Sequence, residues 1–364
     1  MQITSINLKN FRNLSEQRVE LAPRINIFYG DNGQGKTNFL ESLYFCATGR
    51  SHRAVSDKEL IAFDETNAFV QLKYSEGQIH VHLENSRKGI SVNGVPVKKL
   101  GDLLGNLVVV MFGPEDLELA KEGPTVRRRF MDMEICKLSP LYYNELSNYY
   151  RGLRQRNNLL KSVAKDRGLL DTIPVWDEAL VNHGTKIYKL RKKFVEEIGE
   201  ITMVVYKKIA GDKENISLHY KPNITPENFL DKLGRSRERD LKLATTTVGI
   251  HKDDIQILIN EKDIRAFGSQ GQQRTASLSL KLAEIELIKN VRDKNPVLLL
   301  DDVLSELDEK RQKHLLSLIE EIQTVITCTG MEDVLKKVNQ NDTKVFYVEN
   351  GQVNYPAASN GASV

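Results

Sequence analysis

The 364-residue sequence is poor in cysteine, tryptophan and proline, and it contains no long apolar run. Its three cysteines, Cys46, Cys136 and Cys328, are far apart in apolar stretches, which predicts buried, reduced thiols and excludes a disulfide framework. The absence of C-x-x-C or clustered His/Cys spacing excludes a zinc site of the usual kind. No segment approaches 18 consecutive apolar residues, and no secretory signal opens the chain, so we expect a cytoplasmic protein with no membrane partner.

Length and charge suggest two lobes of different character. A chain of this length exceeds the size at which a single core usually stops growing. The net charge of +3 is too small to indicate a nucleic-acid partner by itself. However, residues 116–242 carry 25 Lys and Arg against 19 Asp and Glu, and the remainder is slightly acidic. This distribution fits either a surface that attracts a polyanion or an ordinary solvated helical surface.

One glycine-rich stretch predicts a phosphate-binding loop. The apolar run 25–29 precedes Gly-x-x-x-x-Gly-Lys-Thr, and a helical pattern follows, which is the context that this motif requires. Backbone N–H groups would surround the phosphates, Lys36 would reach the β and γ phosphates of ATP, and Thr37 would hold Mg²⁺. The candidate nucleotide-binding residues here are Gly30, Asp31, Asn32, Gly33, Gln34, Gly35, Lys36, Thr37 and Asn38.

A second motif would complete the catalytic chemistry. The apolar run 297–300 reads as a buried strand, and it ends in Asp301 and Asp302. Asp301 would hold Mg²⁺ opposite Thr37, and Asp302 would orient or deprotonate the attacking water. We therefore predict Lys36 and Asp302 as catalytic residues and Thr37 and Asp301 as metal ligands.

The remaining pattern indicates an α/β fold with a helical insertion. Alternating or apolar runs predict strands at residues 2–8, 68–74, 78–83, 89–92, 107–112, 246–251, 255–259, 297–302, 324–329, 345–349 and 352–354. From 116 to about 243 the period is helical, most clearly at 142–163, 175–210 and 228–239, and another helix is expected at 275–292. We predict an ATPase lobe I of mixed β structure (1–115 and 244–364) and an inserted α-helical lobe II (116–243).

These motifs together resemble the ATPase heads of the ABC class. Gly268-Ser269-Gln270-Gly271-Gln272 keeps the Ser, the second Gly and the Gln of the class signature Leu-Ser-Gly-Gly-Gln. Four further segments make the resemblance more specific: 9–14 (Lys-Asn-Phe-Arg-Asn-Leu), 112–117, 127–130 and 246–254. Over essentially its whole length the chain resembles the RecF family of bacterial recombination-repair proteins.

The resemblance implies an ABC-type P-loop ATPase head that forms a homodimer with ATP. Ser269, Gly271 and Gln272 of one subunit would close on the γ phosphate held by the other, and Arg12 would join the nucleotide-binding residues. The implied cofactors are ATP and Mg²⁺, with slow, DNA-stimulated hydrolysis that releases the dimer. The implied partners are duplex DNA, single-strand/duplex junctions, RecO and RecR, which help to load RecA, in a nucleoid-associated protein.

Three departures from the ABC pattern predict slow turnover. Asp302 stands where the class usually has Glu, and the strand end at Thr327–Gly330 offers no histidine. Glu115 is the nearest candidate for the glutamine expected between the lobes. An ATP-binding scaffold without significant hydrolysis therefore remains open, as does, less favoured, the soluble ATPase subunit of a transporter. The latter should have a full signature, the histidine and a short helical lobe.

Candidate DNA contacts rest on runs of basic residues with few aromatics between them, a composition that favours contact with the duplex backbone. We expect some of the first run to face the interface between the lobes instead. The runs are Arg127–Arg129, Arg151/Arg154/Arg156, Lys189/Arg191/Lys192/Lys193 and Arg235/Arg237/Arg239.

Overall fold

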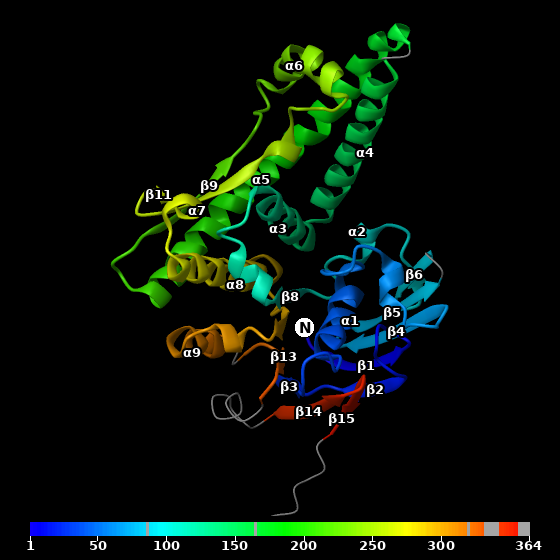
Figure 1. The fold of residues 1–364 in the computed structure, drawn as a ribbon, viewed down its shortest axis with the longest axis vertical. Helices are drawn as coiled ribbons and strands as arrows, with labels where there is room; N and C mark the ends of the chain where they lie inside the picture. The colour runs from blue at the N-terminus through cyan, green and yellow to red at the C-terminus, as the bar shows by residue number, and fades with distance from the viewer. Residues whose placement is uncertain (85–86, 164–165, 319–320, 331–341, 356–364) are drawn as a thin grey trace, which may run out of the picture. The chain divides into compact units, whose positions relative to one another are not determined.

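The computed structural model describes residues 1–84, 87–163, 166–318, 321–330 and 342–355. The chain forms two compact units, one of Met1–Asp116 with Ile288–Val364 and the other of Leu117–Leu287. Figure 1 shows the elements of both, and each unit is described here by itself.

The first unit contains an antiparallel sheet in the order β2-β1-β4-β5-β6-β7. Its alternating burial, seen in the pattern iBiBiBeB of β4, reflects one face that packs on the core and one that meets solvent. Asn93 and Gly94 both have positive φ in the tight hairpin turn between the last two strands. The strands are β1 (Ile3–Lys9), β2 (Gln17–Glu20), β4 (Asn67–Tyr74), β5 (Gly77–Glu84), β6 (Arg87–Val92) and β7 (Val95–Pro96).

The same unit contains a second sheet in the order β15-β14-β3-β13-β12-β8, which is parallel except for the final hairpin. Helix α1 (Lys36–Thr48) contacts strands of both sheets, and nearly all of its residues are buried. Because β8, β12 and β13 are buried throughout, they are the continuous apolar runs that the sequence shows. The strands are β3 (Ile25–Tyr29), β8 (Val109–Phe112), β12 (Val297–Asp301), β13 (Thr324–Cys328), β14 (Thr343–Glu349) and β15 (Gln352–Asn354).

Short helical segments complete this unit. They are η1 (Asp57–Leu60), α2 (Leu100–Leu103), η5 (Leu304–Glu306) and α9 (Glu309–Leu318), with η2 (Pro114–Glu118) at the junction.

The second unit is mainly helical. A three-stranded sheet, β11-β10-β9, packs through β9 on the long helix α5. Its elements are α3 (Pro124–Leu138), α4 (Pro140–Ser162), η3 (Arg167–Thr172), α5 (Ile173–Ala210), β9 (Ile216–Lys221), α6 (Phe229–Leu243), η4 (Ile250–Lys252), β10 (Asp254–Ile259), β11 (Lys262–Asp263), α7 (Ile264–Phe267) and α8 (Gln270–Arg292).

The division between the units differs from the predicted one, which assigned residues 244–287 to lobe I. These residues cluster with the helical unit, and the division falls within α8. The physical reason is a strand that the sequence analysis did not identify, β9, which pairs with β10 from Asp254↔Lys221 to Ile259↔Ile216. In addition, Lys137 of α3 forms a buried ion pair with Glu284 of α8 at 2.8 Å.

One predicted strand was wrong. Residues 246–247 have no regular secondary structure, residues 248–249 form a bend, and η4 follows them. The backbone N–H groups here bond to side chains and not to a neighbouring strand. Thr246 N donates to Asn157 Oδ1, and Thr247 N donates to Asp240 Oδ1. Gly249, with φ 139, leaves no room for a side chain because a Cβ there would lie 2.3 Å from the Tyr149 hydroxyl.

The three cysteines are buried free thiols, as predicted. Among the described residues, no helix is long and apolar enough to cross a membrane.

Candidate nucleotide-binding site

The glycine-rich loop joins β3 to α1 in the first unit. Gly30 and Gly35 have φ of 150° and 118°, values that L side chains rarely adopt. A Cβ on Gly30 would lie 2.3 Å from the Val348 carbonyl oxygen of β14, so only glycine fits there. The loop therefore lies where parallel strands end and a helix begins, with backbone N–H groups available for an anion.

Lys36 is the first residue of α1, and its side chain is folded against the loop. Its ammonium group donates to the carbonyl oxygens of Gly30 at 2.5 Å and Asp31 at 2.8 Å. The side chain is largely buried, so the loop itself keeps the charge of Lys36 at the helix N-terminus. A cation held here is suited to neutralising phosphate oxygens.

Thr37 and Asp301 meet in the structure. The Thr37 hydroxyl donates to Asp301 Oδ1 at 2.8 Å, and the Thr327 hydroxyl donates to the same oxygen at 2.8 Å. Hydroxyl and carboxylate oxygens are the ligands that Mg²⁺ prefers, usually together with waters and substrate phosphates. Among the described residues, no three His, Cys, Asp or Glu side chains gather as a metal site.

Asp302 adopts a left-handed conformation directly after β12, with φ 53. Its N–H donates to the Thr327 hydroxyl at 3.0 Å, so one threonine orients both carboxylate residues. Burial raises the pKa of Asp302, Lys36 opposes that shift, and Asp301 adds to it. A carboxylate with a raised pKa is a better proton acceptor. Because Asp tolerates positive φ better than most residues, this backbone favours Asp over Glu.

Arg12, Asn13 and Asn38 flank the loop on another side. Asn38 donates to Asn13 Oδ1 at 2.8 Å, and Asn13 donates to the Gly33 carbonyl at 3.4 Å. The Arg12 guanidinium forms a two-pronged pair with the buried Glu41 of α1, at 3.0 and 3.1 Å. Its role at the nucleotide stays a prediction, because in this structure its side chain is engaged with Glu41.

The sequence analysis missed several residues that support this site. Burial alone would raise the pKa of Glu41, but hydrogen bonds from Arg12 and Ser51 hold it below the usual value. Burial lowers the pKa of His52, whose electrostatic neighbours include Glu41 and Asp301. No sequence pattern identifies Glu41 or His52, because their roles depend on which side chains surround them in the folded protein.

The C-terminal hairpin also supports the loop. The turn between β14 and β15 donates twice to Gln34, from Asn350 N to Oε1 at 2.6 Å and from Gly351 N to the carbonyl oxygen at 3.0 Å. Gly351 has φ 77, and a Cβ there would lie 1.9 Å from the Asn13 carbonyl oxygen. The predicted loop residue Gln34 thus anchors the loop, while Asp31, Asn32 and Gly33 are exposed.

The signature residues Ser269, Gly271 and Gln272 lie in the second unit, at the N-terminus of α8. Ser269 accepts from Gln272 N at 3.2 Å, and Gln272 Oε1 accepts from Ser269 N at 2.8 Å. Ser269 therefore caps the helix. Its hydroxyl hydrogen is not used in the cap, and both Ser269 and Gly271 are exposed.

Two arginines of the basic runs that the sequence suggested as DNA contacts are instead buried in ion pairs within the helical unit. This corrects the sequence interpretation for these two residues. Arg156 is fully buried and pairs with Asp177 at 2.6 Å and Asp240 at 2.7 Å. Arg191 is also fully buried and pairs with Asp132 and Asp253, each at 2.7 Å. These guanidinium groups hold the helical unit together and are not available to DNA.

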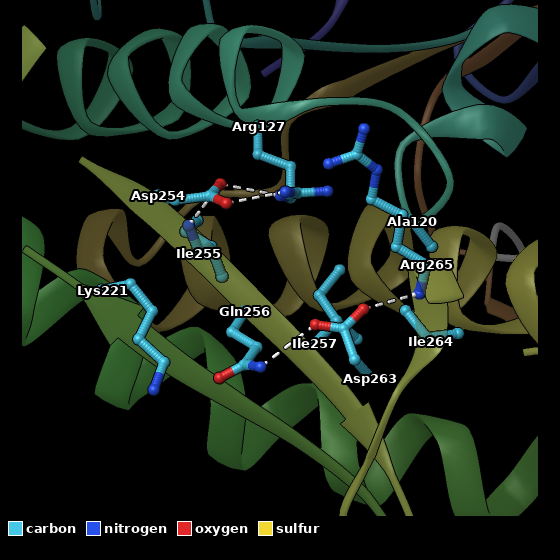
Figure 2. A pocket seen from close by; sticks show the side chains of 10 residues that line it. All are labelled: Ala120, Arg127, Lys221, Asp254, Ile255, Gln256, Ile257, Asp263, Ile264 and Arg265. Carbon is cyan, nitrogen blue, oxygen red and sulfur yellow. Dashed lines mark hydrogen bonds and ion pairs between the residues drawn. The ribbon is translucent and has the colours of Figure 1, made fainter. Parts of the chain in front are cut away.

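Arg127 is likewise engaged. Figure 2 shows its guanidinium against the Asp254 carboxylate, with hydrogen bonds of 2.8 and 2.7 Å. The pair lines a cavity of about 210 Å³ in the second unit, together with Lys221 and Arg265. Exposed members of the basic runs are Arg129, Arg151, Arg154, Lys189, Lys192, Lys193, Arg235 and Arg239.

Comparison with known proteins agrees with this architecture. The AAA domain family matches residues 5–344. The chain is 45% identical to the DNA replication and repair protein RecF of Lachnoclostridium phytofermentans, covering 97% of this chain and 99% of that one. It is 47% identical to the protein of the same name from Agathobacter rectalis, with the same coverage.

Comparison with solved structures identifies the fold. A structure described as the recombination mediator protein RecF with ATP, in the RecFOR pathway, superposes with a TM-score of 0.91 at 35% identity, covering 98% of both chains. The Smc head domain from Pyrococcus furiosus superposes with a TM-score of 0.55 at 16% identity, covering 97% of this chain and 95% of that one, which shows the fold alone. The fold is that of an ABC-type P-loop ATPase head, and the chain belongs to the RecF family of DNA replication and repair proteins.

Proposed function

We propose that this protein is an ATP-dependent, dimerising DNA-binding protein of recombinational repair that hydrolyses ATP slowly. The observation that carries the proposal is the Thr37–Asp301 contact beside the phosphate loop. It brings a hydroxyl and a carboxylate to one point, where Mg²⁺ would be bound with the nucleotide. The RecF-ATP structure supports ATP as the ligand.

In the proposed mechanism, the loop N–H groups and Lys36 would bind the phosphates, and Thr37 and Asp301 would hold the metal. The bound Mg²⁺ would supply charge neutralisation at the phosphate oxygens. Asp302 accepts a proton from the attacking water or orients it. Thr327 keeps both carboxylate residues in place through its two hydrogen bonds.

The second half of the site would come from another copy of the chain. Ser269 accepts a hydrogen bond from the helix, so its own hydrogen remains available to donate to a phosphate. The exposed N-terminus of α8 adds backbone N–H groups and the positive end of the helix dipole. We therefore propose that Ser269, Gly271 and Gln272 close on the γ phosphate bound by the partner, and that hydrolysis releases the dimer.

DNA would be bound through exposed cations of the helical unit. Arg151 and Arg154 of α4 are exposed, whereas Arg156 on the same helix is buried. Contacts of this kind would engage the phosphates of duplex DNA and single-strand/duplex junctions without reading sequence. Membership of the RecF family supports RecO and RecR as partners in loading RecA, at the nucleoid in the cytoplasm.

We assign the lobes by their compact units, with the ATPase lobe holding the phosphate loop, Asp301 and Asp302, and the helical lobe holding the signature and candidate DNA contacts. The alternative of an ATP-binding scaffold rests on the departures at Asp302 and at the strand end 327–330. A transporter subunit is disfavoured by the incomplete signature and the large helical unit.

The decisive experiment is solution mass by analytical ultracentrifugation without nucleotide, with ADP and with ATP. We expect the wild type to form dimers with ATP only, and Ser269→Arg to bind ATP yet stay monomeric. Ser75→Arg, in the turn between β4 and β5, is the matched control and should dimerise. A mass that does not change on ATP binding would leave the signature as a helix cap and reject the shared site.

A further inference from the structure

A carboxylate from outside the signature is bonded to it. Glu214 lies in the loop between α5 and β9, 58 positions before Gln272, and its Oε1 accepts a hydrogen bond from Gln272 Nε2 at 2.7 Å. Both residues belong to the helical unit. The contact therefore joins the signature, at the N-terminus of α8, to the segment that follows the long helix α5.

The bonds at Gln272 fix which way its side-chain amide points. Its Oε1 accepts from Ser269 N at 2.8 Å, and its Nε2 donates to Glu214. Because a backbone N–H can only donate and a carboxylate can only accept, the reverse orientation of the amide would lose both bonds. Glu214 thus favours the one orientation in which Gln272 also holds the Ser269 backbone.

Glu214 is itself held by its surroundings. Its Oε2 accepts from the hydroxyl of Tyr206 at 2.6 Å, and Tyr206 is fully buried near the C-terminal end of α5. The next residue, Asn215, donates from its N–H to Asn260 Oδ1, and Asn260 N donates to the Asn215 carbonyl, each at 2.9 Å. The carboxylate therefore has a defined place in the helical unit.

These contacts end at the hydroxyl proposed to meet the partner's phosphate. Gln272 N donates to Ser269 Oγ at 3.2 Å while Gln272 Oε1 accepts from Ser269 N, so two bonds fix the backbone and the hydroxyl oxygen of Ser269. Because Ser269 is exposed, its position depends on these bonds more than on packing. Donors that are ordered before binding save the entropy of ordering them on binding.

We propose that Glu214 is a positioning residue of the signature. By holding Gln272, it keeps Ser269 in the conformation that receives the γ phosphate bound by a second copy of the chain. The inference rests on the proposed ATP-dependent dimer and extends it to a residue that does not touch the nucleotide.

The first test is the dissociation constant of the ATP-bound dimer, measured by analytical ultracentrifugation of the full chain with Mg²⁺. Loss of a hydrogen bond to a charged group changes an equilibrium constant by about 10- to 150-fold, so Glu214→Ala should weaken the dimer at least about tenfold. The affinity of the monomer for ATP, titrated at low protein concentration, should stay that of wild type, because the phosphate loop belongs to the other unit.

Two variants separate positioning from general damage. Glu214→Gln keeps an oxygen that accepts from Gln272 and gains an N–H that can donate to the Tyr206 oxygen, so it should dimerise nearly as wild type. Asp212→Ala removes an exposed carboxylate from the same loop and should also dimerise as wild type. A Glu214→Gln dimer as weak as that of Glu214→Ala, or a Glu214→Ala dimer as tight as wild type, would overturn the inference.

A double-mutant cycle tests whether Glu214 acts through Gln272. If it does, Glu214→Ala combined with Gln272→Ala should dimerise no more weakly than Gln272→Ala alone, because the shared contact is already lost. Effects that add would overturn the positioning role.

A further readout does not require a dimer. Hydrogen bonds from Ser269 N and Gln272 N slow their exchange with deuterium, so Glu214→Ala should speed exchange several-fold in a peptide spanning residues 269–273, and Asp212→Ala should not. If wild type stays monomeric with ATP, the proposed function fails, and this exchange alone decides whether Glu214 holds the signature. Exchange at the wild-type rate in Glu214→Ala would overturn the inference whatever the mass.

Discussion

The hydroxyl of Thr37 lies 2.8 Å from Oδ1 of Asp301, although 264 residues separate them in the sequence. The pairing follows from adjacent parallel strands, because β13 lies between β3 and β12 and all three end at the same edge of the sheet. This contact gives the first prediction. Thr37→Ala should weaken ATP binding at least about tenfold in Mg²⁺, since the proposed hydroxyl ligand of the metal is lost.

The measurement is calorimetric titration with ATP in Mg²⁺ and in EDTA. The wild type should bind more tightly with the metal, and Thr37→Ala should lose most of that difference. Thr4→Ala, an exposed threonine of β1, is the control and should behave as wild type. An undiminished Mg²⁺ effect in Thr37→Ala would contradict the ligand assignment.

Asp302→Asn should reduce ATP hydrolysis about 10²-fold while leaving ATP binding intact. Asn tolerates the left-handed backbone that Asp302 adopts, so the fold should not change. Phosphate release under single-turnover conditions measures the chemical step directly. Hydrolysis at the wild-type rate would remove Asp302 from the mechanism and favour another base or a scaffold function.

Gly351→Ala should weaken ATP binding although the residue lies far from the phosphate loop in sequence. A Cβ there would overlap the Asn13 carbonyl oxygen and displace the turn that donates to Gln34. We expect several-fold weaker binding and a lower melting temperature. Gly94→Ala is the control: it has φ 82 but no atom within 4 Å of the added Cβ, so it should cost only about 1 kcal/mol of backbone strain.

Arg156→Ala should destabilise the helical unit by about 3–5 kcal/mol, because it leaves Asp240 buried without a cationic partner and Asp177 with Arg237 alone. Urea unfolding, monitored by Trp176 fluorescence, measures the stability of this unit, since Trp176 lies in α5. Arg154→Ala on the same helix removes an exposed side chain, and its stability should change by less than about 0.5 kcal/mol. If DNA binds here, Arg154→Ala should weaken binding and reduce its salt dependence.

His251 should make the helical unit less stable in mild acid. Its Nδ1 accepts from the Tyr149 hydroxyl at 2.9 Å, its Nε2 donates to the Thr246 carbonyl at 3.0 Å, and burial lowers its pKa to about 4. In the unfolded chain the imidazole titrates near 6.5. Between these values the unfolded chain binds a proton that the folded chain does not, so stability falls as pH falls.

The expected loss between pH 7 and pH 4 is roughly 2–3 kcal/mol from this residue. The unfolding free energy of wild type and His251→Gln, measured across that range with Trp176 fluorescence, gives the difference. The variant should show a shallower dependence on pH. Parallel curves would show that His251 does not contribute.

Local pattern alone identified much of this protein. The strand, glycine loop and helix around Lys36, and the buried strand that ends at Asp301, are readable because each depends on residues next to it in the chain. Most strands were predicted correctly for the same reason, whereas the family and the ABC-type fold came from the resemblance of several motifs together to known proteins. Strand β9 was missed, because it lies in a charged region whose dominant period is helical.

The tertiary structure decided which charges are buried and which residues meet. Arg154 and Arg156 look alike in sequence, but only the packing of α4 against α5 and α6 places Arg156 between two aspartates. The support of Gln34 by the C-terminal turn likewise joins segments that are distant in the chain. Burial and charge pairing depend on neighbours in space, and one sequence does not name those neighbours.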